Sequence, residues 1–365
     1  MAAALNMSIS AAQLTITLYL IGLAVGQLAY GPISDQFGRR PVVLAGLALF
    51  TAASLVTVFS RTPSLLITAR ILQSLGGCAG LVLGRAAVRD GAAADKAAAQ
   101  LALLTLVMSM VPAIAPAIGG FLTSWYGWRA SFVLLTAIGG LTLLACLLRL
   151  PETRAPTTTS SRSLLSGYAR LLRSRRFLGY AIGGACSTTA FYGFMSASPF
   201  IFERQLNQSP ERIGLYYLVL MGGVALGSFS ANRVAGRISM PVALRIANMI
   251  GLAGAAAFAL ADITGNLSVF TVVASVFVFM VGAGMASPFA LAGSVSVNPQ
   301  AIGAASGLYG FVQMGYGMLC TIVAEIWSPG SVYPVATILV GSAVLGQIAM
   351  TIAVRAEARR DRIGV

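Results

Sequence analysis

The sequence has 365 residues, of which 57% are apolar and only 9% are charged, and its formal net charge is +14. Soluble globular proteins carry roughly 25% charged residues, so this composition excludes a water-facing surface and places the chain in lipid. The lack of histidine excludes His-based metal sites, haem ligation and Ser-His catalysis, and the four cysteines stand singly in apolar runs, without metal or redox spacing.

Apolar runs recur along the whole chain at the length of a membrane-spanning helix, about 20 residues for a hydrocarbon core of about 30 Å. The 40 glycines and 14 prolines scattered through these runs favour closely packed, locally broken helices. We therefore predict an all-α bundle of eleven spans, near residues 11–33, 42–60, 64–88, 98–121, 129–150, 177–201, 212–234, 240–262, 267–291, 299–327 and 332–354.

Basic residues gather on one side of these predicted spans. Alternate loops, together with the C-terminus, hold 19 of the 24 Lys and Arg residues, and positive charge accumulates in cytoplasmic loops. We expect the C-terminus in the cytoplasm and, if the chain starts at Met1, the N-terminus in the periplasm. On this interpretation the positive net charge sets the topology and is not a nucleic-acid footprint.

The segment GPISDQFGRRP, residues 31–41, concentrates an acid and two arginines between two apolar runs. Two membrane helices joined by a loop this short must turn sharply, which Gly31–Pro32 and Gly38–Pro41 allow. Asp35 should lie near the N-terminus of the next helix, whose partial positive charge favours an anion. Arg39 and Arg40 hold the loop on the cytoplasmic side. Taken alone, the segment could equally be an ordinary turn.

An arginine lies inside the third predicted span, in the run RILQSLGGCAG. Arg70 and Gln73 are three residues apart and share a helix face. A charged side chain inside a span is costly unless it is paired or hydrated, which marks Arg70 as a functional candidate. The alternative is that its side chain extends to the outer membrane surface.

The fourth predicted span contains PAIAPAIGG. Pro112, Pro116 and the pair Gly119 and Gly120 predict a kinked helix with a flat face for close contact. A purely structural kink is the alternative interpretation.

The longest polar segment divides the chain into five spans in residues 1–150 and six in residues 177–365. Residues 151–176 read as a cytoplasmic linker that is rich in Pro, Thr and Ser at first. The second half of this linker places leucines at helical spacing beside arginines, which predicts a basic amphipathic helix on the inner membrane surface.

These segments resemble signatures of the major facilitator superfamily. Residues 31–41 match G-x-x-x-D-x-x-G-R-R, with Gln36 where the family usually has Arg or Lys. The run at Arg70 resembles R-x-x-Q-G-x-G of proton-coupled exporters, with Ser74 replacing the first glycine. The run at Pro116 resembles the antiporter signature G-P-x-x-G-G, with Ala115 replacing the first glycine. Together with GWRASF and LPET, they look like the Bcr/CflA group of drug:proton antiporters over the N-terminal half.

The resemblance implies roles for particular residues. Gly31, Asp35, Gly38, Arg39 and Arg40 would form a switch loop that latches the outward-facing state. Arg70 and Gln73 would couple proton movement to substrate binding, and the segment at Pro116 would distinguish exporters from importers. GSFSANRVAGR, residues 227–237, is a degenerate echo of the switch loop and indicates two related halves.

Members of this family have twelve spans, and the switch loop follows the second of them. Here the loop follows the first predicted span, so the resemblance implies that one helix, with an acidic residue near its outer end, is missing. Either the start codon is assigned too late, which we favour, or the chain is a true eleven-span form.

A transporter of this design binds its substrate near the midplane, between its two halves. Polar and aromatic residues at helical positions are candidates for lining that cavity, although each could equally be a packing residue: Tyr19, Gln27, Thr189, Tyr192, Met195, Tyr309, Gln313 and Tyr316. Acids are scarce, and neither Asp262 nor Glu325, near outer span ends, is a clear proton carrier.

From these observations we expect a multi-pass protein of the bacterial inner membrane that exports drugs or small amphipathic molecules in exchange for protons. The expected partners are its small-molecule substrate, protons and the lipid bilayer, with no nucleic acid, no cofactor and no second subunit. Intramembrane polar groups are too sparse for an enzyme. A metabolite exporter, a proton symporter of the same fold or an inactive truncated form are the alternatives.

Overall fold

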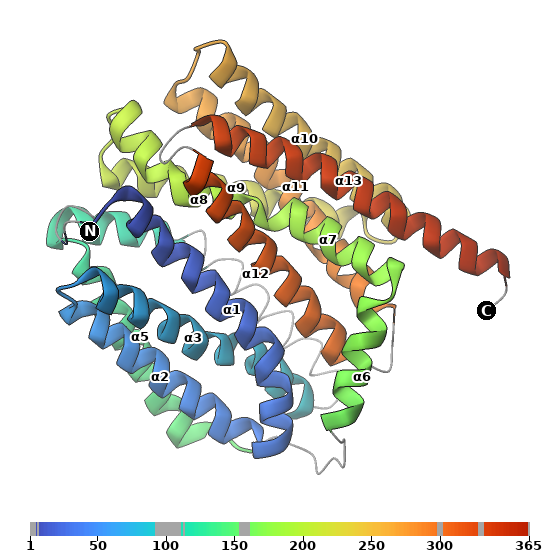
Figure 1. Cartoon of the computed structure of the whole chain (residues 1–365), viewed down its shortest axis with the longest axis horizontal. Helices are drawn as coiled ribbons and strands as arrows, with labels where there is room; N and C mark the ends of the chain where they lie inside the picture. The colour runs from blue at the N-terminus through green and yellow to red at the C-terminus, as the bar shows by residue number, and fades with distance from the viewer. Residues whose placement is uncertain are drawn as a thin grey trace. The chain divides into compact units, whose positions relative to one another are not determined.

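The computed structural model of the chain describes residues 7–91, 114–152, 161–297, 302–327 and 332–363, together with Leu5 and Val111. Helices make up nearly all of these ranges, and no strand occurs within them (Figure 1). The predicted all-α class is therefore confirmed.

Nine helices in the described ranges are long and apolar enough to cross a membrane. Their bounds are α1 (Ile9–Phe37), α2 (Arg39–Phe59), α3 (Pro63–Gly91), α5 (Arg129–Arg149), α9 (Pro210–Val234), α10 (Met240–Ile263), α11 (Val269–Val295), α12 (Ile302–Trp327) and α13 (Val332–Ile363). Each of them coincides with one predicted span, because long apolar runs must satisfy their backbone hydrogen bonds internally in lipid.

One further predicted span is divided, and another is described only in part. The span at 177–201 is divided into α7 (Arg175–Thr189) and α8 (Phe191–Phe200), and a π-helical turn, Ile201–Gln205, follows α8. The span at 98–121 lies mostly outside the described residues, although residues 114–126 are helical.

The predicted sharp turn between the first two spans lies at Gly38, and Gly31–Pro32 takes no part in it. Helix α1 continues through Pro32 and ends at Phe37, and Gly38 alone connects it to α2. A proline removes one backbone donor, which a long membrane helix can lose without ending. Gly38 has a φ of 96°, a conformation that favours glycine, so the reversal of direction takes place there.

The chain consists of two compact units, Met1–Leu165 and Ser166–Val365. In the first unit α2 packs against both α3 and α5, and α1 packs against α3. In the second unit α10 packs against both α11 and α13, and α9 packs against α11. The same order of neighbours therefore occurs twice along the chain, which supports two related halves.

One pair of helices in each unit meets through glycines that bring two backbones together. A Cβ atom added at Gly76 of α3 would lie 2.6 Å from the carbonyl oxygen of Gly46 of α2. A Cβ atom added at Gly254 of α10 would lie 2.6 Å from the carbonyl oxygen of Ser275 of α11. Small residues at such crossings are what van der Waals packing in lipid requires.

The second unit also contains α7 and α8, which have no counterpart among the described residues of the first unit. Helix α7 packs against α11, α12 and α13, and α8 packs against α12. Aromatic side chains fill the space between these helices, with Phe194, Phe202 and Phe258 fully buried in one cluster. The predicted helix in the linker is also present, as α6 (Ser161–Leu172).

Candidate functional site

The connection between α1 and α2 is held together by the ion pair of Asp35 and Arg39. Arg39 Nη2 lies 3.0 Å from Asp35 Oδ1, and Arg39 Nη1 donates a hydrogen bond to Ser34 Oγ. This is the one ion pair recorded in the described parts of the chain. It joins the last turn of α1 to the first residue of α2, across Gly38.

Asp35 lies close to the N-terminus of α2, as expected, through its ion pair with Arg39. A second carboxylate, Glu152, binds the backbone of that N-terminus. The backbone N–H groups of Arg39 and Arg40 donate to Glu152 Oε1 and Oε2 at 2.9 and 3.1 Å. Two donors that the helix itself cannot satisfy are thereby bonded to a carboxylate, which also complements the helix dipole. In return, Arg40 Nη2 donates to the carbonyl oxygen of Leu147 at the end of α5, at 3.0 Å.

The opposite end of α2 is capped by an arginine from the start of α5. Arg129 Nε donates to Val58 O at 3.0 Å, and its Nη2 donates to Ser60 O at 2.8 Å. Its guanidinium also stacks on the ring of Trp128, with Cζ 4.4 Å from the ring centroid. Glu152, just after α5, therefore binds the positive N-terminal end of α2, and Arg129, at the start of α5, binds its negative C-terminal end. Contacts at both ends fix the two helices to each other.

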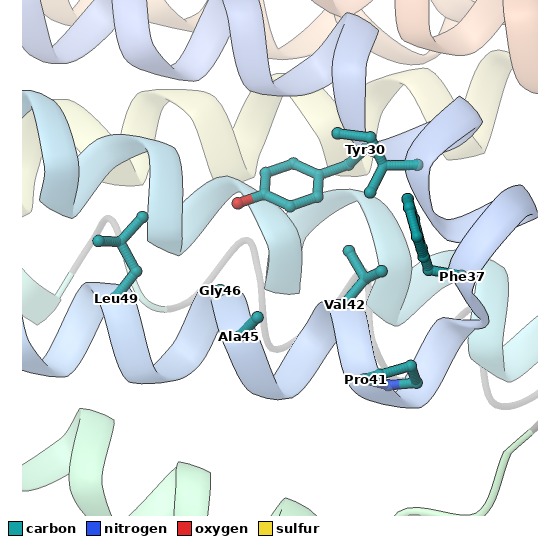
Figure 2. A pocket seen from close by; sticks show the side chains of 8 residues that line it. Tyr30, Phe37, Pro41, Val42, Ala45, Gly46 and Leu49 are labelled. Atoms are coloured by element: carbon teal, nitrogen blue, oxygen red, sulfur yellow. The ribbon is translucent and has the colours of Figure 1, made fainter.

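An apolar groove lies beside the switch loop, between the second half of α1 and the first half of α2. Figure 2 shows Tyr30 and Phe37 of α1 facing a row of α2 residues, Pro41, Val42, Ala45, Gly46 and Leu49. The groove has a volume of about 390 Å³. Tyr30 turns its hydroxyl away to donate to Leu75 O on α3, at 2.9 Å. The charges of the switch loop thus stand at the end of a hydrophobic groove.

Arg70 lies at the centre of a polar network inside the first unit. Its Nη1 donates to Gln73 Oε1, Gln73 Nε2 donates to Ser54 Oγ on α2 at 2.7 Å, and Ser54 Oγ donates to Phe50 O at 2.7 Å. The guanidinium also stacks on Tyr19 of α1, with 4.2 Å between Cζ and the ring centroid. Residues of α1, α2 and α3 therefore contribute to one network.

The surroundings of Arg70 explain how a cation can be held there. An arginine at the centre of a membrane helix costs about 2.5–3.5 kcal/mol on insertion scales. A desolvated cation–π contact contributes about 2 kcal/mol, and a hydrogen bond to a charged group about 1.5–3 kcal/mol. Phe132 of α5 adds a second ring face, 5.6 Å from Arg70 Cζ. The contacts of Arg70 are thus sufficient to retain its charge inside the bundle.

The antiporter segment is described only in part. Pro112 lies outside the described residues, whereas Pro116, Gly119 and Gly120 belong to the helical residues 114–126. A Cβ atom added at Gly119 would meet no atom of the described chain within 4 Å. The predicted close contact through this glycine therefore has no described partner.

The candidates of the second unit cluster where α7 meets α12. Gln313 Nε2 donates to Thr188 Oγ1 at 2.8 Å and to Tyr309 Oη at 3.2 Å, and Thr189 Oγ1 donates to Gln313 O at 3.0 Å. Tyr309 and Thr189 are buried, with exposed fractions of 4% and 3%. These side chains therefore join α7 to α12 and are not free to bind a ligand without rearrangement.

The other four cavity candidates do not belong to the hydrogen-bonded cluster of Gln313, and they lie on α1, α8 and α12. Tyr316 shares a hydrogen bond of 2.7 Å with Ser342 Oγ on α13. Tyr192 packs beside Gly317 of α12, and Met195 packs against the aromatic cluster around α8. Gln27 is half-buried on α1, eight residues beyond Tyr19.

The two acids considered as proton carriers lie at helix ends in the second unit. Asp262, in the last turn of α10, lines a groove of about 310 Å³ against α13. Glu325 is half-buried near the end of α12. Neither forms an ion pair with any described residue.

Glu152 and Ser54 are the residues of the site that sequence patterns missed. Glu152 belongs to LPET, directly after an apolar run, but its partners lie 113 and 112 positions earlier in the chain. Ser54 stands in an apolar span with no charged neighbour that would single it out.

Comparisons with known proteins support the resemblance drawn from the motifs. The family model "Major Facilitator Superfamily" matches residues 1–321. The chain is 30% identical over 334 residues to "Multidrug resistance protein D" of Escherichia coli (strain K12), covering 90% of this chain and 83% of that relative. It is 28% identical over 363 residues to "Chloramphenicol resistance protein" of Pseudomonas aeruginosa, covering 94% and 84%.

A solved structure agrees at the level of the fold. The structure titled "Crystal structure of D-xylose-proton symporter" has a TM-score of 0.74 and 16% identity, covering 97% of this chain and 90% of that one. The family model, the relatives and the helical bundle agree, and the chain belongs to the major facilitator superfamily of multi-pass membrane transporters.

Proposed function

We propose that this transporter exports drugs or other small amphipathic molecules across the bacterial inner membrane in exchange for protons, with its C-terminus in the cytoplasm. The observation that carries the proposal is the Arg70 network within the membrane-spanning helices. A charged side chain inside a bundle marks a substrate or ion pathway by default. The proton gradient supplies the driving force, so no cofactor is required.

Drugs are the proposed substrate class because two relatives carry names that refer to drug resistance. The candidates in the membrane helices fit this class, since they combine aromatic rings with a few polar groups. Tyr19 beside Arg70 is an example.

The switch loop supports a transporter that alternates between two states. The side chains of Asp35 and Arg39 are partly exposed, with exposed fractions of 33% and 12%. An ion pair that water reaches contributes about 0–1 kcal/mol, so this pair can break and form again at little cost. The bonds from Glu152 and Arg129 to the two ends of α2 keep that helix fixed to α5 meanwhile. Movement would then be concentrated at the pair itself, next to Gly38.

The test is export of chloramphenicol from cells that lack their own drug exporters. Cells expressing the full-length gene should accumulate less of the labelled drug than cells with an empty vector, and an uncoupler that collapses the proton gradient should abolish the difference. A difference that persists with the uncoupler would contradict antiport. Faster uptake in place of export would indicate a symporter.

The variant Arg70→Gln should abolish the uncoupler-sensitive export at an unchanged level of protein in the membrane. Arg61→Gln is the matched control, because Arg61 is exposed in the connection between α2 and α3 and the substitution removes the same charge. Equal export by both variants would contradict a role for Arg70.

A further inference from the structure

The guanidinium of Arg70 has hydrogen-bonding capacity that the described residues leave unused. An arginine offers five N–H donors, and the described structure gives Arg70 one hydrogen bond, from Nη1 to Gln73 Oε1, together with the ring faces of Tyr19 and Phe132. The residue as a whole is half-buried.

A second unused donor lies beside it. The Tyr19 hydroxyl makes no hydrogen bond with any described residue, although its ring lies 4.2 Å from Arg70 Cζ. A Cβ atom added at Gly77 of α3 would be 3.9 Å from Tyr19 Oη, so the hydroxyl lies over a position on α3 that carries no side chain. The ring of Phe50 lies closer to the same position, with its Cδ2 at 3.3 Å, so the hydroxyl and this ring share the space beside the glycine.

Gln73 is held in place by one hydrogen bond at each end of its amide. Its Oε1 accepts from Arg70, and its Nε2 donates to Ser54 Oγ at 2.7 Å. What the network can present to an anion is therefore the cation of Arg70 and the hydroxyl of Tyr19, both of which can donate to it.

The positive charge of Arg70 is also not neutralised by the described protein. No carboxylate in the described ranges lies within ion-pair distance of Arg70, and the recorded ion pair there is that of Asp35 and Arg39. The rings of Tyr19 and Phe132 stabilise the cation through their π-faces but carry no charge. An anionic group would supply what is missing, whereas an ammonium group would be repelled.

We infer that Arg70 and Tyr19 form a binding subsite for the carboxylate of a small aromatic acid. The inference rests on the proposed function, because it names the class of substrate that the transporter selects. The guanidinium would bind the carboxylate oxygens through its planar edge, and Tyr19 would donate a further hydrogen bond. Substrates with an ammonium group in the same position are selected against.

The experiment compares two probes of the same ring and opposite charge, 4-nitrobenzoate and 4-nitrobenzylammonium. Their binding to the full-length protein in detergent is measured by isothermal titration calorimetry. We expect 4-nitrobenzoate to bind at least about tenfold more tightly, the effect of a single charge-assisted contact. Arg70→Gln should abolish this preference, and Arg61→Gln should preserve it.

Tyr19→Phe keeps the ring and removes only the hydroxyl, so it tests the subsite even if Arg70→Gln does not fold. It should weaken 4-nitrobenzoate about fivefold, the loss of one hydrogen bond, and leave 4-nitrobenzylammonium unchanged. Equal affinity for the two probes, no binding of either, or a preference that survives Arg70→Gln in folded protein overturns the inference.

The subsite and the proposed function can fail separately. Uncoupler-sensitive export of chloramphenicol without a charge preference in binding would reject the subsite and leave the export function standing. A charge preference that depends on Arg70, in a protein that exports nothing, would support the subsite and reject the export function.

Discussion

The backbone contact between α2 and α3 gives a prediction whose size follows from the structure. Replacing Gly76 by alanine places a Cβ atom 2.6 Å from Gly46 O and also too close to the backbone nitrogen of Phe50. An ordinary contact needs at least 3.4 Å, so α2 and α3 must move apart by about 1 Å. Overpacking of this kind costs about 1–3 kcal/mol.

Gly80 provides the matched control on the same helix. It lies one turn beyond Gly76, and a Cβ atom added there meets nothing within 4 Å. Both substitutions raise helix propensity by about 1 kcal/mol, so the difference between the variants isolates the cost of separating the two helices. At about 2–4 °C for each kcal/mol, we expect Gly76→Ala to melt several degrees below Gly80→Ala.

The separation should also reach the functional network, because Gln73 and Ser54 lie one turn away on the same two helices and share a bond of 2.7 Å. Thermal unfolding in detergent measures the stability, and chloramphenicol efflux at matched protein levels measures the function. If the two variants have the same melting temperature, α2 and α3 do not meet through Gly76, and the packing argument is refuted.

Three further predictions concern the ends of α2. Glu152→Gln should lower the free energy of unfolding by about 0.5–1 kcal/mol, because the amide keeps one acceptor but loses the charge at the helix N-terminus. Thermal unfolding measures this loss, and an unchanged melting temperature would contradict it. Arg129→Lys should lower the free energy of unfolding by about 1–2 kcal/mol in the same assay, since lysine cannot donate to two carbonyls and also stack on an indole. If Arg129→Ala lowers it by the same amount, the positive charge contributes nothing. Asp35→Asn should change the stability by less than about 1 kcal/mol but slow efflux, and a variant that is unstable yet fully active would disprove a latch.

The sequence alone was sufficient for the nine membrane helices of the described residues, because lipid imposes a simple rule on length and polarity. The predicted span at 129–150 and the helix Arg129–Arg149 differ by one residue at one end. The exception is the break between α7 and α8 at Ala190, where no glycine or proline marks the sequence. At that position the local structure depends on packing against neighbouring helices, such as α12, and not on a residue type that breaks helices.

The site was predictable as a set of residues but not as a set of contacts. The cost of an arginine in a span pointed to Arg70, and spacing along one helix paired it with Gln73. Its aromatic partner comes from α1, and Ser54 comes from α2. Local patterns cannot supply such pairs, since they depend on how the helices pack. Glu152 was overlooked for the same reason.

The single residue between α1 and α2 limits how the first unit can deform. With Gly38 as the whole connection, there is no spare length of chain, so the two helices cannot slide past each other at that end. Any tilt of α1 must pull the first turn of α2 along, and through Glu152 the end of α5 as well. A tilt of α1 would therefore be passed on to α2 and α5, with the bend in the chain at Gly38.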